Sequence, residues 1–134
     1  IGGLSESRQV LFLDEPVASL DLCHQLVLMD RAADLAAEGI AVVAVLHDLN
    51  LAVRYADRLV VLAEGRVRAI GRPATVVGPQ LLRDVFGIDL PIGGAPPADM
   101  PFVLPQLHRP RRAAGSAMDE SFSGRTDPVA AIGR

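Results

Sequence analysis

The feature that most limits the fold of this chain is an unbroken apolar run at residues 40–46, Ile-Ala-Val-Val-Ala-Val-Leu. The run is rich in β-branched side chains and does not alternate apolar with polar residues, so it predicts a strand buried on both faces, as in a parallel sheet. A shorter apolar run at residues 10–13 predicts a second buried strand. Between the two, residues 22–38 carry apolar side chains at steps of three and four, which is typical of one helix face. Strand, helix and strand in this order predict a parallel βαβ unit, and therefore an α/β fold.

Weaker patterns follow the βαβ unit and predict a small hairpin and C-terminal helices. Glu64-Gly65 is a turn sequence between two apolar runs, and Gly87 is a typical helix stop. The expected elements are a helix at 48–56, hairpin strands at 58–63 and 66–70, a helix at 79–86 and a last short strand at 88–90.

The composition changes near Leu90. Residues 91–134 hold seven of the ten prolines and five of the twelve glycines, and they show little periodicity. Segments of this kind do not bury enough apolar surface to become ordered. The sequence therefore predicts two parts, a folded unit at residues 1–90 and a Pro/Gly-rich tail at residues 91–134 that is largely disordered.

The charged residues and the single cysteine exclude several classes of protein. Sixteen acidic against thirteen basic side chains, a formal net charge of −3, exclude a strongly basic nucleic-acid binder. Cys23 is the only cysteine, which excludes a disulfide framework and pairs of cysteine metal ligands. No apolar run exceeds seven residues, so no stretch is long enough to span a bilayer. The chain opens on Ile1 with no signal-peptide pattern, and we expect it to be the later part of a longer protein.

Polar side chains follow both predicted strands at the point where each strand ends. Asp14 and Glu15 come directly after the first strand, and His47 and Asp48 come after the second. Because the carboxyl ends of neighbouring parallel strands meet at one edge of a sheet, we expect these four side chains to lie close together. One carboxylate there can hold Mg²⁺, a second can act as a general base toward a water, and a histidine can stabilise developing phosphoryl charge. Phosphoryl transfer requires this set of groups.

Each pair alone also has a plain structural explanation. Asp-Glu-Pro at 14–16 can be a solvated turn, and His47-Asp48 can be the start of a helix with its cap. The two pairs together, at the spacing that a crossover connection demands, favour the functional interpretation.

Three motifs of this chain resemble motifs of the ATP-binding cassette (ABC) ATPases. Val-Leu-Phe-Leu-Asp-Glu-Pro at 10–16 is similar to the Walker B strand, Ala-Ser-Leu-Asp at 18–21 to the D-loop, and Leu-His-Asp-Leu-Asn at 46–50 to the switch-histidine segment. Their order and spacing match the family, and the similarity covers residues 8–90. At residues 20–25, 46–57 and 101–105, the chain most resembles the ATPases of heme and ferric-siderophore importers, and among these the hemin type.

The resemblance implies a partial P-loop NTPase fold that uses ATP and Mg²⁺. By matching position, it implies that Asp14 supports Mg²⁺, that Glu15 polarises the attacking water and that His47 contacts the γ-phosphate. Asp21 matches the D-loop aspartate, which works across a nucleotide-sandwich dimer with a second ATPase subunit. The resemblance also implies transmembrane permease subunits as partners, no nucleic acid, and a peripheral place at the cytoplasmic face of the inner (plasma) membrane.

Two motifs of the family have no counterpart in this chain. The Walker A phosphate cradle, G-x-x-x-x-G-K-[ST], needs a lysine, and all thirteen basic residues here are arginine. Leu-Ser-Glu-Ser at 4–7 lies too close to Asp14 and lacks the glycines of the signature motif. We therefore expect this chain to be the C-terminal part of a cassette and to be inactive alone. Where neighbouring strands of the whole cassette are missing, we expect the exposed apolar strands to promote aggregation.

Three functions stay open on the sequence. The first is an ATP-hydrolysing subunit of an importer for hemin or an iron-siderophore, of which this chain is a part. The second is a degenerate, non-hydrolysing cassette that acts as a structural or binding partner of a complete one. The third is an unrelated metal-dependent α/β hydrolase that uses Asp14, Glu15, His47 and Asp48.

Overall fold

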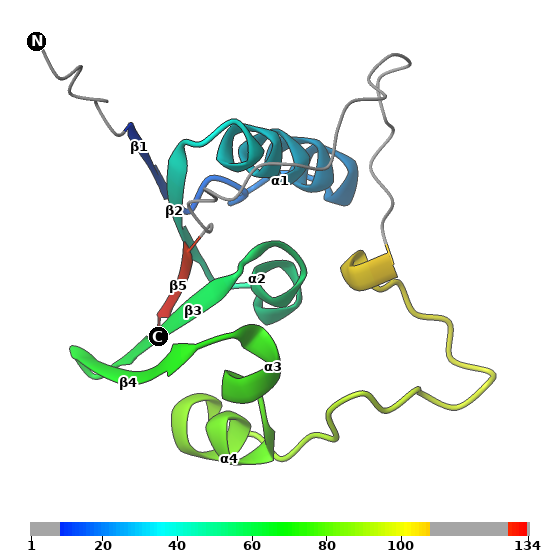
Figure 1. The fold of residues 1–134 in the computed structure, drawn as a ribbon. Helices are drawn as coiled ribbons and strands as arrows, with labels where there is room; N and C mark the ends of the chain where they lie inside the picture. The colour runs from blue at the N-terminus through cyan, green and yellow to red at the C-terminus, as the bar shows by residue number, and fades with distance from the viewer. Residues whose placement is uncertain (1–8, 108–128, 134) are drawn as a thin grey trace, which may run out of the picture.

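The computed structural model describes residues 9–107 and 129–133, and its centre is a five-stranded sheet. The strands are β1 (Val10–Asp14), β2 (Ala41–Leu46), β3 (Arg58–Ala63), β4 (Arg66–Gly71) and β5 (Val129–Gly133), in the spatial order β1-β2-β5-β3-β4. All the strands except β4 run parallel, and β4 is antiparallel to β3. The labelled helices lie on one side of the sheet (Figure 1).

The predicted βαβ unit is confirmed, with α1 (Leu22–Ala37) connecting β1 to its parallel neighbour β2. Asp21 caps the helix N-terminus, since its carboxylate accepts a hydrogen bond from the backbone N–H of His24 at 2.9 Å. Leu22, the first apolar residue of the helix face predicted at 22–38, is exposed. The buried residues of the helix are Met29, Ala32 and Ala36. The stripe that packs on β1 and β2 therefore begins in the second turn of the helix.

The main core lies between the sheet and α2 (Leu49–Tyr55). The side chains without exposed surface come from β2, α2 and β3, and they are Leu46, Leu51, Leu59 and Val61. Burial of one such side chain contributes roughly 2 kcal/mol to the free energy of unfolding. Because Leu46 and Leu51 bracket residues 47–50, this packing fixes the segment that follows β2.

The predicted hairpin is also confirmed. Glu64 and Gly65 connect β3 to β4 with left-handed backbones, φ +53° and +69°, as a tight hairpin turn requires. The helix predicted at 79–86 is present as α4 (Pro79–Leu81) followed by the π-helical turn η1 (Leu82–Phe86), and it stops at Gly87, whose φ is +68°.

Two short segments differ from the expectation. The helix α3 (Pro73–Val76) has no counterpart in the predicted elements, because four residues are too few to show a helical period. The strand predicted at 88–90 is wrong, since these residues form no regular structure. The run is only three residues long, and Pro91 after it has no N–H to donate to a ladder.

The predicted tail contributes a strand to the sheet. β5 pairs with β2 on one side and with β3 on the other, so residues 129–133 of the predicted tail are part of the sheet. A five-residue strand in a Pro/Gly-rich stretch shows too little periodicity to be predicted. Residues 91–107 form irregular chain that ends in a 3₁₀ turn, η2 (Pro105–Leu107). The expectation for residues 108–128 lies outside the described residues.

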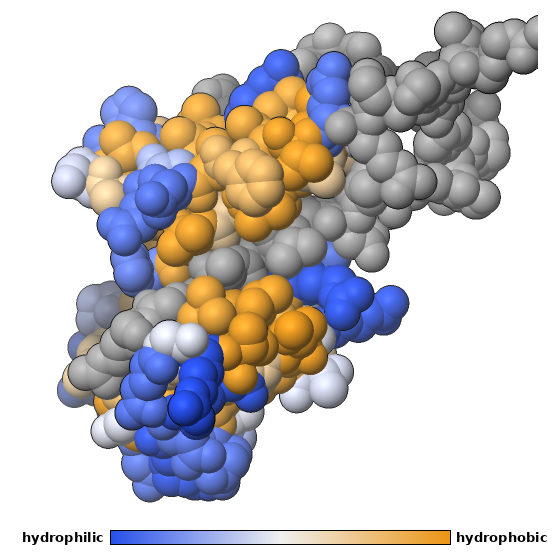
Figure 2. Space-filling view, turned by 90° about the vertical axis from the view of Figure 1, so that its left-hand side faces the viewer, coloured by the Kyte–Doolittle hydropathy of each residue, from blue (hydrophilic) through white to orange (hydrophobic). Residues whose placement is uncertain are grey.

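The sheet has a covered face and a face on which no described element packs, which we call the open face. On β2, alternate side chains are buried under the helices, and Val43 and Val45 between them are only partly buried. Figure 2 shows the side turned away from the helices, where apolar side chains gather in two areas. The exposed large apolar residues of the open face are Val10, Phe12, Leu62, Val67 and Ile70. The prediction of burial on both faces therefore holds for one face of the described structure.

Within residues 9–107 and 129–133, no helix has the length and apolar character that crossing a membrane requires.

Candidate functional site

The carboxyl ends of β1 and β2 lie side by side and form the β1–β2 edge, which carries Asp14, Glu15 and His47. Asp14, the last residue of β1, is in register with Val45. The backbone N–H of Glu15 donates to the carbonyl of Val45 at 3.1 Å, so the pairing continues one residue beyond the strand. His47 directly follows Leu46, the last residue of β2. The parallel pairing thus brings both polar segments to one edge.

Glu15 and His47 are in direct contact at this edge. Glu15 Oε1 and His47 Nε2 lie 2.6 Å apart, although the two residues are 32 positions apart in the sequence. An ionised carboxylate can only accept, so the imidazole nitrogen is the donor of a short hydrogen bond. The side chains of His47 and Glu15 are 58% and 49% exposed. The pair is therefore held in place and is still open to a ligand.

The backbone of Glu15 is strained. Its φ is +46°, in the left-handed region that glycine favours. For another residue this conformation costs of order 1 kcal/mol, and such residues cluster at functional sites. The extended backbone of β1, which ends with Asp14, therefore changes conformation at Glu15.

Asp14 carries an exposed carboxylate at the end of β1. The side chain is exposed and has no hydrogen-bond or ion-pair partner among the described residues. Over the same part of the chain, no group of three or more His, Cys, Asp or Glu residues is placed to hold a metal ion. One exposed carboxylate fits the way Mg²⁺ binds with a nucleotide, through one or two carboxylates and the phosphates of the substrate.

Asp48 has a local structural role. Its Oδ1 accepts hydrogen bonds from the backbone N–H groups of Asn50 at 2.7 Å and Leu51 at 3.1 Å, so it caps the N-terminus of α2. Of the His47-Asp48 pair, the plain explanation therefore fits Asp48, whereas His47 reaches Glu15.

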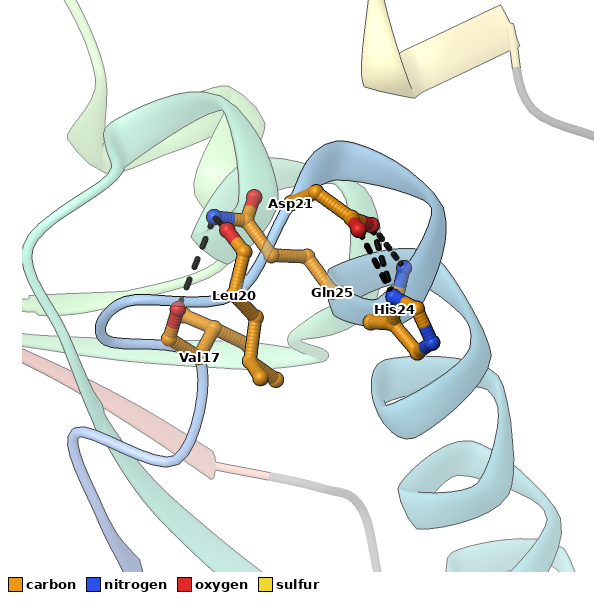
Figure 3. Close-up of polar contacts among 5 residues, drawn as sticks. All are labelled: Val17, Leu20, Asp21, His24 and Gln25. Atoms are coloured by element: carbon orange, nitrogen blue, oxygen red, sulfur yellow. Dashed lines mark hydrogen bonds and ion pairs between the residues drawn. The ribbon is translucent and has the colours of Figure 1, made fainter.

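Asp21 lies at the far end of the loop from Glu15. Its carboxylate accepts hydrogen bonds from the backbone N–H of His24 at 2.9 Å and from His24 Nδ1 at 2.8 Å (Figure 3). The backbone hydrogen bond first, and the imidazole second, hold the pKa of Asp21 below the ordinary value of 3.8. Asp21 is thus an ionised, exposed group fixed by the first turn of α1.

Gln25 is absent from the residues that the sequence predicts for the site, yet it contacts the loop between β1 and α1. Its Nε2 donates to the carbonyl of Leu20 at 2.9 Å and approaches the carbonyl of Val17 at 3.5 Å (Figure 3). A signal for it exists in the sequence, because Gln25 stands at helical spacing ahead of the buried stripe that begins with Met29. A polar residue in line with an apolar stripe indicates a specific partner.

Comparison with known proteins identifies relatives of the chain. No protein-family model matches it. Hemin import ATP-binding proteins of Mesorhizobium japonicum, Bartonella henselae and Myxococcus xanthus are 53%, 49% and 49% identical to it over 103, 100 and 107 residues. These stretches cover 77%, 75% and 80% of this chain, and 39%, 38% and 40% of the relatives. The chain thus spans about two fifths of the length of the curated relatives it matches. The resemblance predicted from the motifs is confirmed.

Proposed function

We propose that this chain, which is similar to hemin import ATP-binding proteins, is the C-terminal part of an ATP-binding cassette ATPase. In this proposal the whole protein binds and hydrolyses ATP to energise an importer of hemin or of an iron-siderophore. Its activity, cargo and partners all belong to the proposal, because the chain covers only 38–40% of these relatives.

The observation that carries the proposal is the contact between Glu15 and His47. Two strands from distant parts of the sequence bring a carboxylate and an imidazole to 2.6 Å at the β1–β2 edge. General principles place ligands at this edge of a parallel sheet. A carboxylate accepts a proton or a hydrogen bond from water, and an imidazole N–H donates to a phosphoryl oxygen.

The two side chains have complementary roles in the proposed reaction. Glu15 accepts a hydrogen bond from the attacking water and orients it toward the terminal phosphorus. His47 turns its Nε2–H from Glu15 to the γ-phosphoryl oxygens, which carry negative charge in the transition state. Their 2.6 Å contact keeps both groups within reach of the same small volume.

Asp14 and Asp21 complete the assignments. Asp14 would hold Mg²⁺, directly or through water, and the cation supplies neutralisation of phosphate charge when it is bound with ATP. Asp21 would act toward the nucleotide across a dimer with a second ATPase subunit, and its lowered pKa keeps it ionised in that position. Transmembrane permease subunits at the cytoplasmic face of the plasma membrane are the further partners.

The sequence of this chain supplies only part of the nucleotide site. A phosphate cradle needs the lysine of G-x-x-x-x-G-K-[ST], and none of the 134 residues is lysine. Under the proposal, the cradle and the signature motif belong to the rest of the longer protein, and residues 1–134 alone do not hydrolyse ATP.

The test is Glu15→Gln in the full-length ATPase, assembled with its permease. The amide keeps the shape but cannot accept the proton, so we expect hydrolysis to fall at least about 100-fold while ATP binding is retained. Glu38→Gln is the matched control, because Glu38 is an exposed glutamate at the opposite end of α1. Normal turnover in Glu15→Gln would contradict the assigned role.

Two other functions are separated by simple observations. The lack of lysine favours, as the second candidate, a degenerate cassette that pairs with a complete one and does not hydrolyse ATP. It predicts that the DNA directly upstream encodes no glycine-rich loop with a lysine. An unrelated hydrolase predicts Mg²⁺-dependent turnover by residues 1–134 alone, and the capping role of Asp48 removes one of its four groups.

A further inference from the structure

The loop at residues 15–21 holds Glu15 at one end and Asp21 at the other. Two of its residues, Glu15 with φ +46° and Ser19 with φ +65°, have left-handed backbones without being glycine. Such conformations cost of order 1 kcal/mol each and persist only where the surroundings determine them. The groups that hold this loop therefore decide where the Glu15 carboxylate points.

Hydrogen bonds within the loop form two successive turns. The N–H of Ala18 donates to the carbonyl of Glu15 at 3.0 Å, and the N–H of Leu20 donates to the carbonyl of Val17 at 3.2 Å. The Val17 side chain is buried in the main core. These contacts shape the loop and anchor its middle, but they do not tie its second half to α1.

Gln25 makes that connection. Its part-buried carboxamide donates to the Leu20 carbonyl and approaches the Val17 carbonyl, so one nitrogen with two N–H groups contacts both carbonyls (Figure 3). The backbone N–H of Gln25 also donates to the carbonyl of Asp21 at 2.9 Å. One residue in the first turn of α1 thus contacts the loop at three carbonyls.

We propose that Gln25 is a positioning residue for ATP hydrolysis. By holding the carbonyls of Val17 and Leu20, its carboxamide keeps the loop in the strained form that directs the Glu15 carboxylate toward His47. This inference rests on the proposed function, which gives Glu15 the task of orienting the attacking water. Gln25 acts through the loop, and it needs no contact of its own with the nucleotide.

The role of position 25 requires a side chain that donates hydrogen bonds to the carbonyls of Leu20 and Val17. Leucine has nearly the same size but no donor. It would remove the hydrogen bond to the Leu20 carbonyl, and it would leave the Val17 carbonyl with only the N–H of Leu20. Glutamate has the same shape, but its ionised carboxylate only accepts and would face two carbonyl oxygens. A protonated glutamate regains one donor.

The first experiment compares kcat, KM for MgATP and the melting temperature of the full-length ATPase and its Gln25→Leu variant in the assembled transporter. We expect kcat to fall about tenfold or more, because a misdirected Glu15 slows the chemical step. KM should change less than about twofold, since the groups that bind the nucleotide are untouched. Gln80→Leu is the matched control, because Gln80 donates to Asp84 within α4 and η1, at the other end of the described fold (Figure 1).

The second experiment uses Gln25→Glu over a range of pH. Partial burial and two facing carbonyl oxygens disfavour the ionised form, so the pKa of the introduced carboxyl should lie above the ordinary value of about 4.3. The ratio of the variant's kcat to that of the unmodified protein should therefore rise as the pH falls from 8 to 6, because protonation restores a donor toward Leu20. A residue that served only stability would lower the melting temperature without this return of kcat.

The outcomes separate the two claims. Unchanged kcat in Gln25→Leu overturns the role of Gln25 and leaves the proposed function standing. A loss of kcat that follows only the loss of folded protein, with no recovery of Gln25→Glu at pH 6, overturns it as well. If the unmodified transporter does not hydrolyse ATP, the proposed function fails, and this inference fails with it.

Discussion

The two faces of the sheet are both apolar in sequence, but they differ in what lies against them. On the covered face, side chains from β2, α2 and β3 pack until residues such as Leu46 and Leu51 have no exposed surface. On the open face, Phe12 of β1 is 74% exposed, and no described element packs on it. Burial therefore depends on the neighbouring layer and cannot be read from the apolar run alone.

The difference also concerns the candidate site. His47 and Asp48 lie between Leu46 and Leu51, two of the most buried residues of the covered face. The position of His47 beside Glu15 thus depends on the packing of α2. The open face contributes little to that position, so changes there should leave the β1–β2 edge intact.

The largest expected effect is at Leu51. Leu51→Ala removes a fully buried side chain and should lower the free energy of unfolding by about 3 kcal/mol. Phe12→Ala removes a larger side chain from the open face and should change the free energy of unfolding by less than about 0.5 kcal/mol. Urea unfolding followed by circular dichroism measures both. Equal losses would show that the open face is covered in solution.

A smaller effect is expected at Asp48, which caps α2. Asp48→Ala removes the acceptor of two backbone N–H groups, and we expect a loss of about 1 kcal/mol in the same urea experiment. Asp48→Ser keeps a capping oxygen and should retain most of the stability. If the alanine and serine variants are equally destabilised, the cap is not what holds the start of α2.

The smallest effect concerns the charge of Asp21. Its pKa is lowered in the folded chain, so its ionised form stabilises the fold above the ordinary value of 3.8, and this contribution is lost as the pH falls through the lower folded pKa. Asp21→Asn keeps a neutral cap without the charge. Its free energy of unfolding should therefore fall less steeply between pH 5 and pH 2. If the free energy of unfolding of Asp21→Asn and of the unmodified chain changes with pH in parallel, the charge of Asp21 does not stabilise the fold.

The parts of the fold that periodicity encodes were predictable from the sequence. The β1, α1 and β2 elements have apolar patterns long enough to be recognised, and the order of the three fixes a parallel connection. The same rule predicts that polar groups at the two strand ends meet, and Glu15 and His47 do. The sequence does not predict α3, which is only four residues long, or β5, which lies in a Pro/Gly-rich stretch and pairs with β2 and β3 through long-range contacts.

Other features depend on packing that a single sequence does not display. The exposure of Leu22 follows from where α1 begins to contact the sheet. The sequence allows both a capping role for Asp48 and a role beside His47, and only the geometry of α2 separates the two. The contact of Gln25 with the loop needs the two left-handed residues, whose conformations no propensity predicts.

The most direct test of the account is a double-mutant cycle on ATP hydrolysis by the full-length ATPase in its transporter, with Glu15→Gln, His47→Ala and the double variant. Groups that act as one unit give strongly non-additive losses. If Glu15 and His47 act as one unit, the double variant hydrolyses ATP no more slowly than the slower single variant. A double variant whose loss equals the product of the two single losses would show that Glu15 and His47 act independently, against the proposed mechanism.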